Sequence, residues 1–253
     1  PEHIYCISFS IPGAVDVENK IWQYCERVPG IKEVMFDSIA GKGVLPPQFY
    51  LQHNIHAQAY SVIPIEKIEN KDYVFIHVGQ GMAMSANMGG ILYGHRGFAG
   101  EIGHIPYPYL KQEIDCLCGK KNCLEAVLRE QKILEYVRQH FSVAINALGE
   151  ITDDLIKQRV AEDYILPPLV YTATIVSNIF DPNRIFIEGS VLEPFFPFLK
   201  DVFEERLQDS AWLSGPSDIS WCKSNQTDGC YGAVLHSNDK IINDFVGQID
   251  LDH

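Results

Sequence analysis

The chain has 253 residues, and its 20 Lys and Arg stand against 33 Asp and Glu, a formal net charge of −13. This acidity disfavours direct binding of nucleic acid, which depends on basic side chains that neutralise phosphates. Hydrophobic residues make up 46% of the chain and charged residues 21%. These values are typical of a soluble globule with room for one large or two small domains. The sequence has no run of about 18 apolar residues, so no membrane span is expected.

The seven cysteines indicate in which cellular compartment the protein is expected. An odd number, with three in one short segment, fits a reducing cytosol better than a disulfide scaffold. No signal peptide is visible, so we expect a cytoplasmic protein. The sequence lacks an initiator Met and enters an apolar strand almost at once, which is typical of a piece cut from a longer protein. We expect four cysteines to be plain buried thiols: Cys6, Cys25, Cys222 and Cys230.

The first part of the chain alternates strand and helix signals. An apolar strand over Ile4–Ile11 ends in a Pro-Gly turn. A short strand over Phe49–Gln52 leads through Asn54 into a helix-like run over His56–Ile63. Asn is a favoured helix N-cap, and its amide can equally bind a hydroxyl group. Both roles stay open for Asn54.

A strong strand follows over Asp72–Val78, rich in β-branched and aromatic residues. It runs into the short glycine pair Gly79 and Gly81. Backbone N–H groups of glycine-rich turns can hold a phosphate. A single Gly-x-Gly is a weak signal, however, and suits a hairpin turn equally well.

The segment Gly97–Glu125 is the most informative stretch of the chain. Thiolates and a neutral imidazole are the ligands that Zn²⁺ prefers, and four of them complete a tetrahedral structural site. Gly119 allows a tight turn between the cysteines. The alternatives are a disulfide between Cys123 and either Cys116 or Cys118, or simple buried thiols. The proposed zinc ligands are His104, Cys116, Cys118 and Cys123.

Two carboxylates, Glu101 and Glu125, bracket the predicted metal ligands. A ligating His normally gives its second ring N–H to an acceptor, so His104 could also face a bound molecule. Carboxylates beside an imidazole suit a sugar, because each hydroxyl both donates and accepts. The alternative is that both carboxylates only support the metal ligands or face solvent.

The rest of the chain predicts a parallel-sheet α/β lobe. Helices are expected over Ala126–Asn146 and Leu169–Phe180, the second stopped by Asp-Pro. A short buried strand follows from Arg184 to Gly189, with Glu188 beside the glycine. A phenylalanine cluster is expected in the core or in a dimer interface: Phe195, Phe196, Phe198 and Phe203.

Taken together, these motifs resemble the signature of the ROK family, the bacterial sugar kinases and sugar-responsive repressors. The resemblance spans about residues 4 to 235. It rests on GFAGEIGH and CLCGKKNCLE in Gly97–Glu125, and on SIPGAVD at Ser10–Asp16, QHNIHAQAY at Gln52–Tyr60, HVGQGMAMSANMGGILYG at His77–Gly94 and NIFDPNRIFIEGSV at Asn178–Val191.

The resemblance implies an α/β fold of the actin-like (ribonuclease H-like), two-lobed ATPase type with zinc near the sugar site, here with an incomplete N-terminal lobe. It implies that Asn54 and Gly13 lie at the sugar. ROK kinases carry Asn-Asp where this chain has Asn54 and Ile55. The Asp is their general base, and loss of a base typically costs about 10²–10⁴-fold in rate. The domains expected are a small-lobe remnant over 1–65 and a larger zinc-containing lobe over 66–253.

We therefore expect the effector-binding and dimerisation region of a ROK repressor, without catalytic residues. Its expected partners are a sugar or sugar phosphate, a second copy of the chain, and DNA only through an absent N-terminal domain. One alternative is an ATP-dependent sugar kinase, which needs a base and phosphate-binding turns. Another is a non-catalytic, zinc-containing scaffold that acts through protein contacts.

Overall fold

The computed structural model describes residues 6–28, 30–40, 48–66, 72–92, 94–212, 218–225 and 228–250. By its internal packing the chain divides into two compact units. Unit 1 comprises residues 1–69, 93–99 and 225–253, and unit 2 comprises 70–92 and 100–224. The domains expected from the sequence, 1–65 and 66–253, stay a prediction.

Unit 1 contains two small sheets. Strands β1 (Ile7–Ile11) and β5 (Phe49–His53), both expected from the sequence, pair in parallel. An antiparallel sheet has the order β2-β3-β4 and leads into the short helix α1. Five buried side chains from the two sheets and α1 form a shared core: Ile11, Val15, Phe36, Phe49 and Leu51. The bounds are Ala14–Asp16 for β2, Ile21–Tyr24 for β3, Val34–Met35 for β4 and Phe36–Ala40 for α1.

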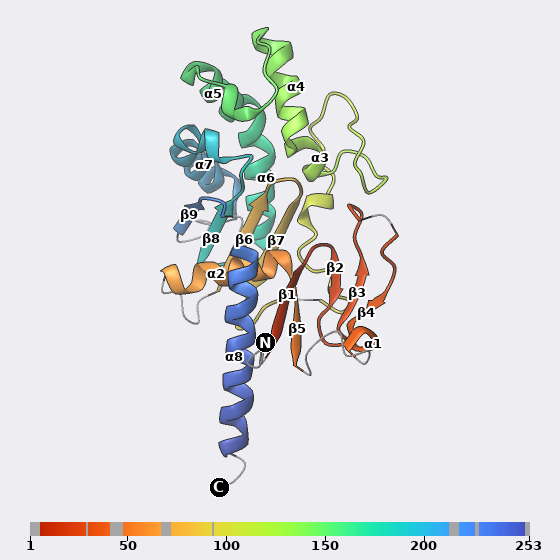
Figure 1. Ribbon diagram of the computed structural model, residues 1–253. Coiled ribbons are helices and arrows are strands. Elements are labelled where there is room, and N and C mark those ends of the chain that lie inside the picture. Colours follow the sequence, from red (N-terminus) through yellow and green to blue (C-terminus); the bar gives the residue numbers. More distant parts are fainter. Residues whose placement is uncertain are drawn as a thin grey trace. The chain divides into compact units, whose positions relative to one another are not determined.

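Two helices complete unit 1 and pack directly against each other (Figure 1). They are α2 (Asn54–Glu66) and α8 (Asp228–Asp250). A Cβ atom at Gly232 of α8 would lie 1.6 Å from the carbonyl oxygen of Ala57 in α2. The bare glycine backbone therefore permits this close packing. Together with the contacts of α8 to β1 and β5, it joins the C-terminal part of the chain to the first part of unit 1.

Unit 2 is built on a four-stranded sheet in the order β7-β6-β8-β9. Strands β6, β8 and β9 are parallel, as predicted for this lobe, and β7 pairs antiparallel with β6. The Gly79-x-Gly81 segment forms the hairpin turn, with the Gly79 N–H donating to the Gly81 carbonyl oxygen at 2.8 Å. The bounds are Tyr73–Val78 for β6, Met82–Asn87 for β7, Arg184–Glu188 for β8 and Asp218–Cys222 for β9.

The helices of unit 2 surround a large apolar core (Figure 1). The helix expected over Ala126–Asn146 is divided at Arg129, whose backbone is extended, with φ −67° and ψ 147°. The bounds are Leu124–Leu128 for α3, Glu130–Phe141 for α4, Asp154–Val160 for α5, Leu166–Phe180 for α6 and Phe196–Ser210 for α7, with short helical turns at Ile102–His104 (η1), Leu148–Glu150 (η2), Ala161–Ile165 (η3) and Glu193–Phe195 (η4).

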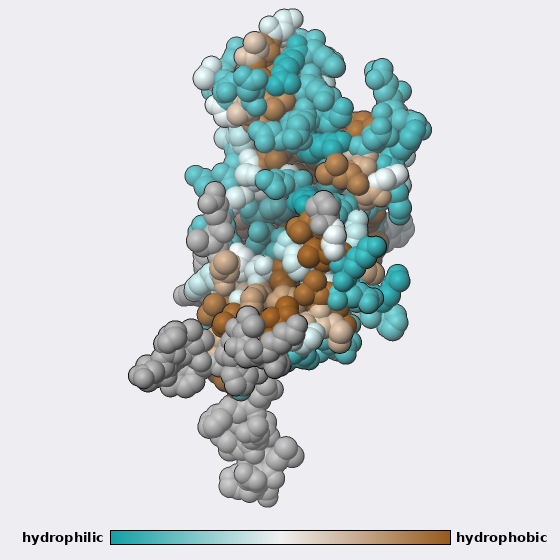
Figure 2. Space-filling view, turned by 45° about the vertical axis from the view of Figure 1, so that its right-hand side comes forward, coloured by the Kyte–Doolittle hydropathy of each residue, from teal (hydrophilic) through white to brown (hydrophobic). Residues whose placement is uncertain are grey.

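Burial in unit 2 follows the sequence pattern. Helix α4 buries Ile133, Leu134 and Val137, and Figure 2 shows a mainly hydrophilic surface over the region of α4 and α5. Phe195, Phe196 and Phe203 are buried and Phe198 is partly buried against them. The phenylalanine cluster is therefore core. Among the described helices, none has both the length and the apolar character needed to cross a membrane.

Candidate metal centre

The cysteine-rich loop of unit 2 is organised by Asn122. Its backbone oxygen accepts from the Tyr107 N–H at 2.7 Å, and its own N–H donates to the Ile114 carbonyl at 2.7 Å. Its side-chain oxygen accepts from the Ile114 N–H at 2.9 Å. The φ of Asn122 is +61°, a left-handed value that Asn tolerates better than most residues. These bonds fix a loop that holds little apolar material.

A tight turn brings the first two cysteines of the loop back toward the third. The Gly119 N–H donates to the Cys116 carbonyl at 3.0 Å, and the Cys116 N–H donates to the Lys120 carbonyl at 2.8 Å. Gly119 has φ +83°, which favours glycine because no Cβ is present to clash. The turn expected at this glycine is therefore present.

The four predicted metal ligands come together in this loop. One ligand atom from each of His104, Cys116, Cys118 and Cys123 lies within 4.8 Å of the others. The Cys116 Sγ lies 3.9 Å from the His104 Nδ1, and the Cys118 Sγ lies 3.8 Å from the Cys123 Sγ. All seven cysteines are free, so neither disulfide that the sequence left open is formed.

The electrostatics of the cluster suit a cation. Burial, with the neighbouring Cys118 and Cys116 thiols, raises the pKa of Cys123 to about 12. Burial also raises the pKa of Cys116. Three close thiols cannot all ionise without a compensating charge, and a bound dication supplies it. Three sulfurs and one imidazole form the donor set of a structural zinc site, so these residues fit zinc.

Glu101 and His104 lie at the two ends of the η1 turn. The Glu101 Oε2 lies 3.7 Å from the His104 Nε2, the ring nitrogen that does not face Cys116. Between them, a Cβ atom at Gly103 would lie 2.1 Å from the Met82 carbonyl oxygen of β7. The glycine of the Glu-x-Gly-His motif therefore allows η1 to lie directly on the strand, which holds the imidazole at the cluster.

Glu125 lies in the first turn of α3 and is buried, with 7% of its surface exposed. Its Oε2 accepts a hydrogen bond from the Met82 N–H at 3.1 Å. The carboxylate therefore ties the start of α3, next to the ligand Cys123, to the start of β7. This is a supporting role for the cluster; a role toward a sugar stays a prediction.

The other predicted ligand residues, Asn54 and Gly13, belong to unit 1. Asn54 is the first residue of α2, directly after β5. Gly13 has φ +80°, and a Cβ atom there would lie 2.3 Å from the Tyr24 carbonyl oxygen. The glycine is thus required by the chain's own packing. Ile55 is an apolar core residue, 4% exposed. The metal ligands, Glu101 and Glu125 belong to unit 2.

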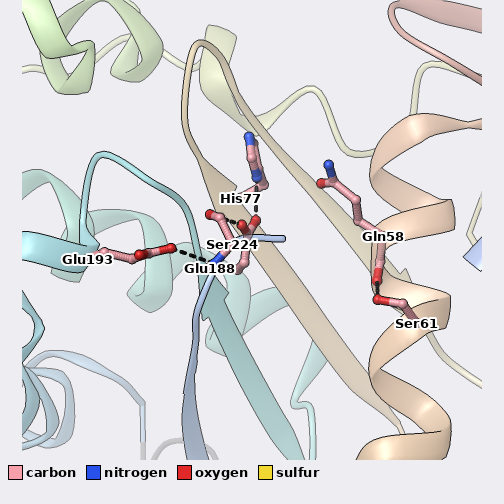
Figure 3. Close-up of polar contacts among 6 residues, drawn as sticks. All are labelled: Gln58, Ser61, His77, Glu188, Glu193 and Ser224. Carbon is pink, nitrogen blue, oxygen red and sulfur yellow. Dashed lines mark hydrogen bonds and ion pairs between the residues drawn. The ribbon is translucent and has the colours of Figure 1, made fainter. Parts of the chain in front are cut away.

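Sequence reasoning missed a polar cluster at the strand ends of unit 2, shown in Figure 3. The His77 Nδ1 lies 2.5 Å from the Glu188 Oε2, and the Ser224 hydroxyl donates to the Glu188 Oε1. A signal was available. His77 and Glu188 each stand near the carboxyl end of an expected strand, and such ends meet at one edge of a parallel sheet.

Comparisons with known proteins agree with the motifs. The ROK family model matches residues 3–239. The chain is 31% identical over 207 residues to the DNA-binding transcriptional dual regulator NagC of Escherichia coli K12, which covers 75% of this chain and 49% of NagC. A ROK family transcriptional regulator described as a homologue of the E. coli MLC protein superposes with a TM-score of 0.70 at 22% identity, covering 89% of this chain and 60% of that chain. A ROK family glucokinase from Streptomyces griseus, in complex with glucose and AMPPNP, superposes with a TM-score of 0.68 at 17% identity, covering 91% of this chain and 80% of that chain.

The fold is thus the α/β, actin-like ATPase type found in ROK kinases and regulators, as predicted. The chain belongs to the ROK family. It spans about half the length of NagC.

Proposed function

We propose that this chain is the effector-binding and dimerisation region of a ROK-type transcriptional regulator of sugar metabolism. Its effector is a sugar or a sugar phosphate. The 31% identity to NagC supports a regulator. The alignment covers 49% of NagC, so the proposal concerns the region that this chain represents.

Ile55 is the observation that carries the choice of a regulator over a kinase. It follows Asn54 at the start of α2, where the family resemblance places the general base of the kinases. Its side chain is aliphatic and buried, with 4% of its surface exposed. A buried alkyl group cannot accept the proton of an attacking hydroxyl, so efficient phosphoryl transfer is not expected.

The proposed effector ligands are Asn54 and Gly13 in unit 1, and Glu101, His104 and Glu125 in unit 2. Their chemistry supports a sugar, because carboxylate, amide and imidazole groups satisfy hydroxyls that both donate and accept. Zinc is the proposed structural metal, held by His104 and the three loop cysteines. It would order the loop between η1 and α3, and thereby the position of the His104 ring.

The remaining partners are proposals that go with this function. DNA is contacted by another domain of the protein, which agrees with the net charge of −13 on this chain. The chain forms a homodimer or a higher assembly, and the protein acts in the cytoplasm. An effector that binds one conformation more tightly than another would shift the regulator between two states.

Calorimetry with a panel of neutral sugars and their 6-phosphates, including N-acetylglucosamine and glucose, tests the effector. We expect one compound to give a saturable heat that Glu101→Ala abolishes. A control substitution at the exposed Glu204 on α7 should leave the heat unchanged. If no member of the panel gives heat with folded, zinc-loaded protein, the effector proposal is wrong.

A coupled ADP-release assay with the same sugars and MgATP tests the kinase alternative. We expect no turnover above background. Steady turnover that Glu101→Ala abolishes would instead make the chain a sugar kinase, despite Ile55.

A further inference from the structure

Ser224 has a special place in the chain. It is the last residue of unit 2, and the chain continues into unit 1 from Asn225. Strand β9 ends two residues earlier, at Cys222. Ser224 therefore lies where the chain leaves unit 2.

Two carboxylates of unit 2 hold Ser224 (Figure 3). The backbone N–H of Ser224 donates to the Glu193 Oε1 at 2.5 Å. The hydroxyl of Ser224 donates to the Glu188 Oε1. Backbone and side chain are thus bonded at the same time, by residues from η4 and from the end of β8. Hydrogen bonds to charged acceptors are stronger than those between neutral groups.

Glu188 is itself held rigidly. It is 5% exposed, and its second oxygen lies 2.5 Å from the His77 Nδ1 on the neighbouring strand β6. The next residue, Gly189, lies so close to β6 that a Cβ atom there would be 1.8 Å from the Val78 carbonyl oxygen. A buried carboxylate needs such partners to offset its lost hydration. The bonds from Glu188 therefore join β6, β8 and the segment after β9.

The same contacts disfavour a phosphate site at this edge of the sheet. The Gly79 N–H, which could have faced an anion, is bonded to the Gly81 carbonyl within the hairpin turn. The His77 ring lies over Gly79, with its Nε2 2.6 Å from where a Cβ atom would be. The carboxylate of Glu188 would also repel an anion. The cluster is better explained by bonds within the protein.

We propose that Glu188 is a positioning residue that clamps Ser224 to the strand ends of unit 2, so that the connection to unit 1 begins after Ser224. The role concerns the chain's own conformation and is independent of any effector. Without these bonds, the segment after β9 would become more mobile. The last firmly held residue of unit 2 would then be Cys222 and not Ser224.

Amide hydrogen exchange, measured at residues 223–225 on the full chain, tests the clamp. We expect Ser224→Ala to speed exchange in this segment by about tenfold to 150-fold, the range set by loss of one hydrogen bond to a charged group. Glu188→Ala should act at least as strongly. The double variant should match Glu188→Ala alone, because both substitutions remove the same bond.

The matched control is Glu205→Ala, an exposed glutamate on α7 of the same unit, which should leave exchange at 223–225 unchanged. Unchanged exchange in Ser224→Ala would overturn the proposal. Faster hydrogen exchange spread evenly over β8 and β9 would also overturn the proposal, because that pattern indicates general destabilisation. If Glu188→Ala does not fold, Ser224→Ala decides the question by itself.

Discussion

The Glu125 carboxylate accepts a hydrogen bond from the Met82 N–H at 3.1 Å, and both residues are buried. Removing this acceptor leaves a buried N–H unsatisfied. We therefore expect Glu125→Ala to lower the free energy of unfolding by about 1.5–3 kcal/mol. Glu125→Gln keeps a side-chain oxygen and should cost less. Urea denaturation monitored by circular dichroism measures both variants.

The same two variants distinguish a structural role of Glu125 from a role in binding the effector. If Glu125 only ties α3 to β7, Glu125→Gln should bind an effector found by calorimetry as the parent does. A large loss of affinity in a stable Glu125→Gln protein would assign the carboxylate to the ligand. Equal stability of Glu125→Ala and the parent would contradict the supporting role.

Metal content is the second prediction. Protein purified without added metal should hold about one zinc per chain by elemental analysis, as a Cys₃His donor set binds one ion. Cys123→Ser should lose most of it, because this sulfur is fully buried in the cluster. A chelator should lower the melting temperature of the parent, since structural zinc contributes to folding.

Cys230→Ser is the matched control, because Cys230, wrongly expected from the sequence to be buried, is an exposed free thiol in unit 1. It should retain zinc and melt as the parent does. Well-folded parent protein without zinc, or Cys123→Ser with full zinc content, would remove the metal site.

Gly103 gives a third prediction. A methyl group at this position would meet the Met82 carbonyl oxygen at 2.1 Å. We expect Gly103→Ala to push η1 away from β7, to displace His104 and to lower stability by about 1–3 kcal/mol. Zinc should dissociate faster, as measured by transfer to a chromogenic chelator.

Gly149→Ala provides the comparison, since no atom lies within 4 Å of a Cβ built there. It should change neither stability nor zinc release appreciably. If Gly103→Ala behaves like Gly149→Ala, the close packing of η1 on β7 is not required for the metal site.

Three buried histidines of unit 1 give a pH prediction. Burial lowers the pKa of His53 to about 4. Burial, then repulsion from His53 and His236, lowers that of His56 to about 3. Burial, with a smaller effect of Lys240, lowers that of His236 to about 4. The unfolded chain binds these protons near pH 6.5. Stability is therefore fully present above about pH 6.5 and is lost as the pH falls toward 4.

The variant His236→Phe isolates one of these groups. It keeps a ring against Tyr60, whose centroid lies 5.2 Å from that of the imidazole. The loss of unfolding free energy between pH 7 and pH 5 should be smaller than in the parent by about 2 kcal/mol. His95→Gln, at an exposed histidine, should leave the pH dependence unchanged. An unaltered slope in His236→Phe would contradict the prediction.

Local sequence patterns predicted much of the fold. Apolar runs located β1, β5, β6 and β8, because buried strands are short and continuous in hydrophobicity. The Glu-x-Gly-His motif and the cysteine spacing predicted that His104 and three cysteines lie together, and in the structure they do. The Asp-Pro stop marked the end of α6 at Phe180.

Contacts between distant segments were harder to predict. No Pro or Gly in the sequence marks the break between α3 and α4 at Arg129. In the structure, the Arg129 guanidinium donates to the carbonyl of the distant Asp115 at 2.7 Å. The bonds of Glu188 to His77 and Ser224 join residues 111 and 36 positions apart. Periodicity within one segment cannot show such pairings, because they depend on strand order.

The division of the chain between its units has a consequence for biosynthesis. Unit 1 needs both the first 69 residues and the segment after Ser224. Helix α2 packs against α8 through residues such as Gly232, which are made after residues 70–224. The packing of α2 against α8 therefore waits while residues 70–224 are made, and unit 2 can fold first. During that interval the side of α2 that packs on α8 is uncovered, so a ribosome stalled before residue 228 would leave this helix without its partner.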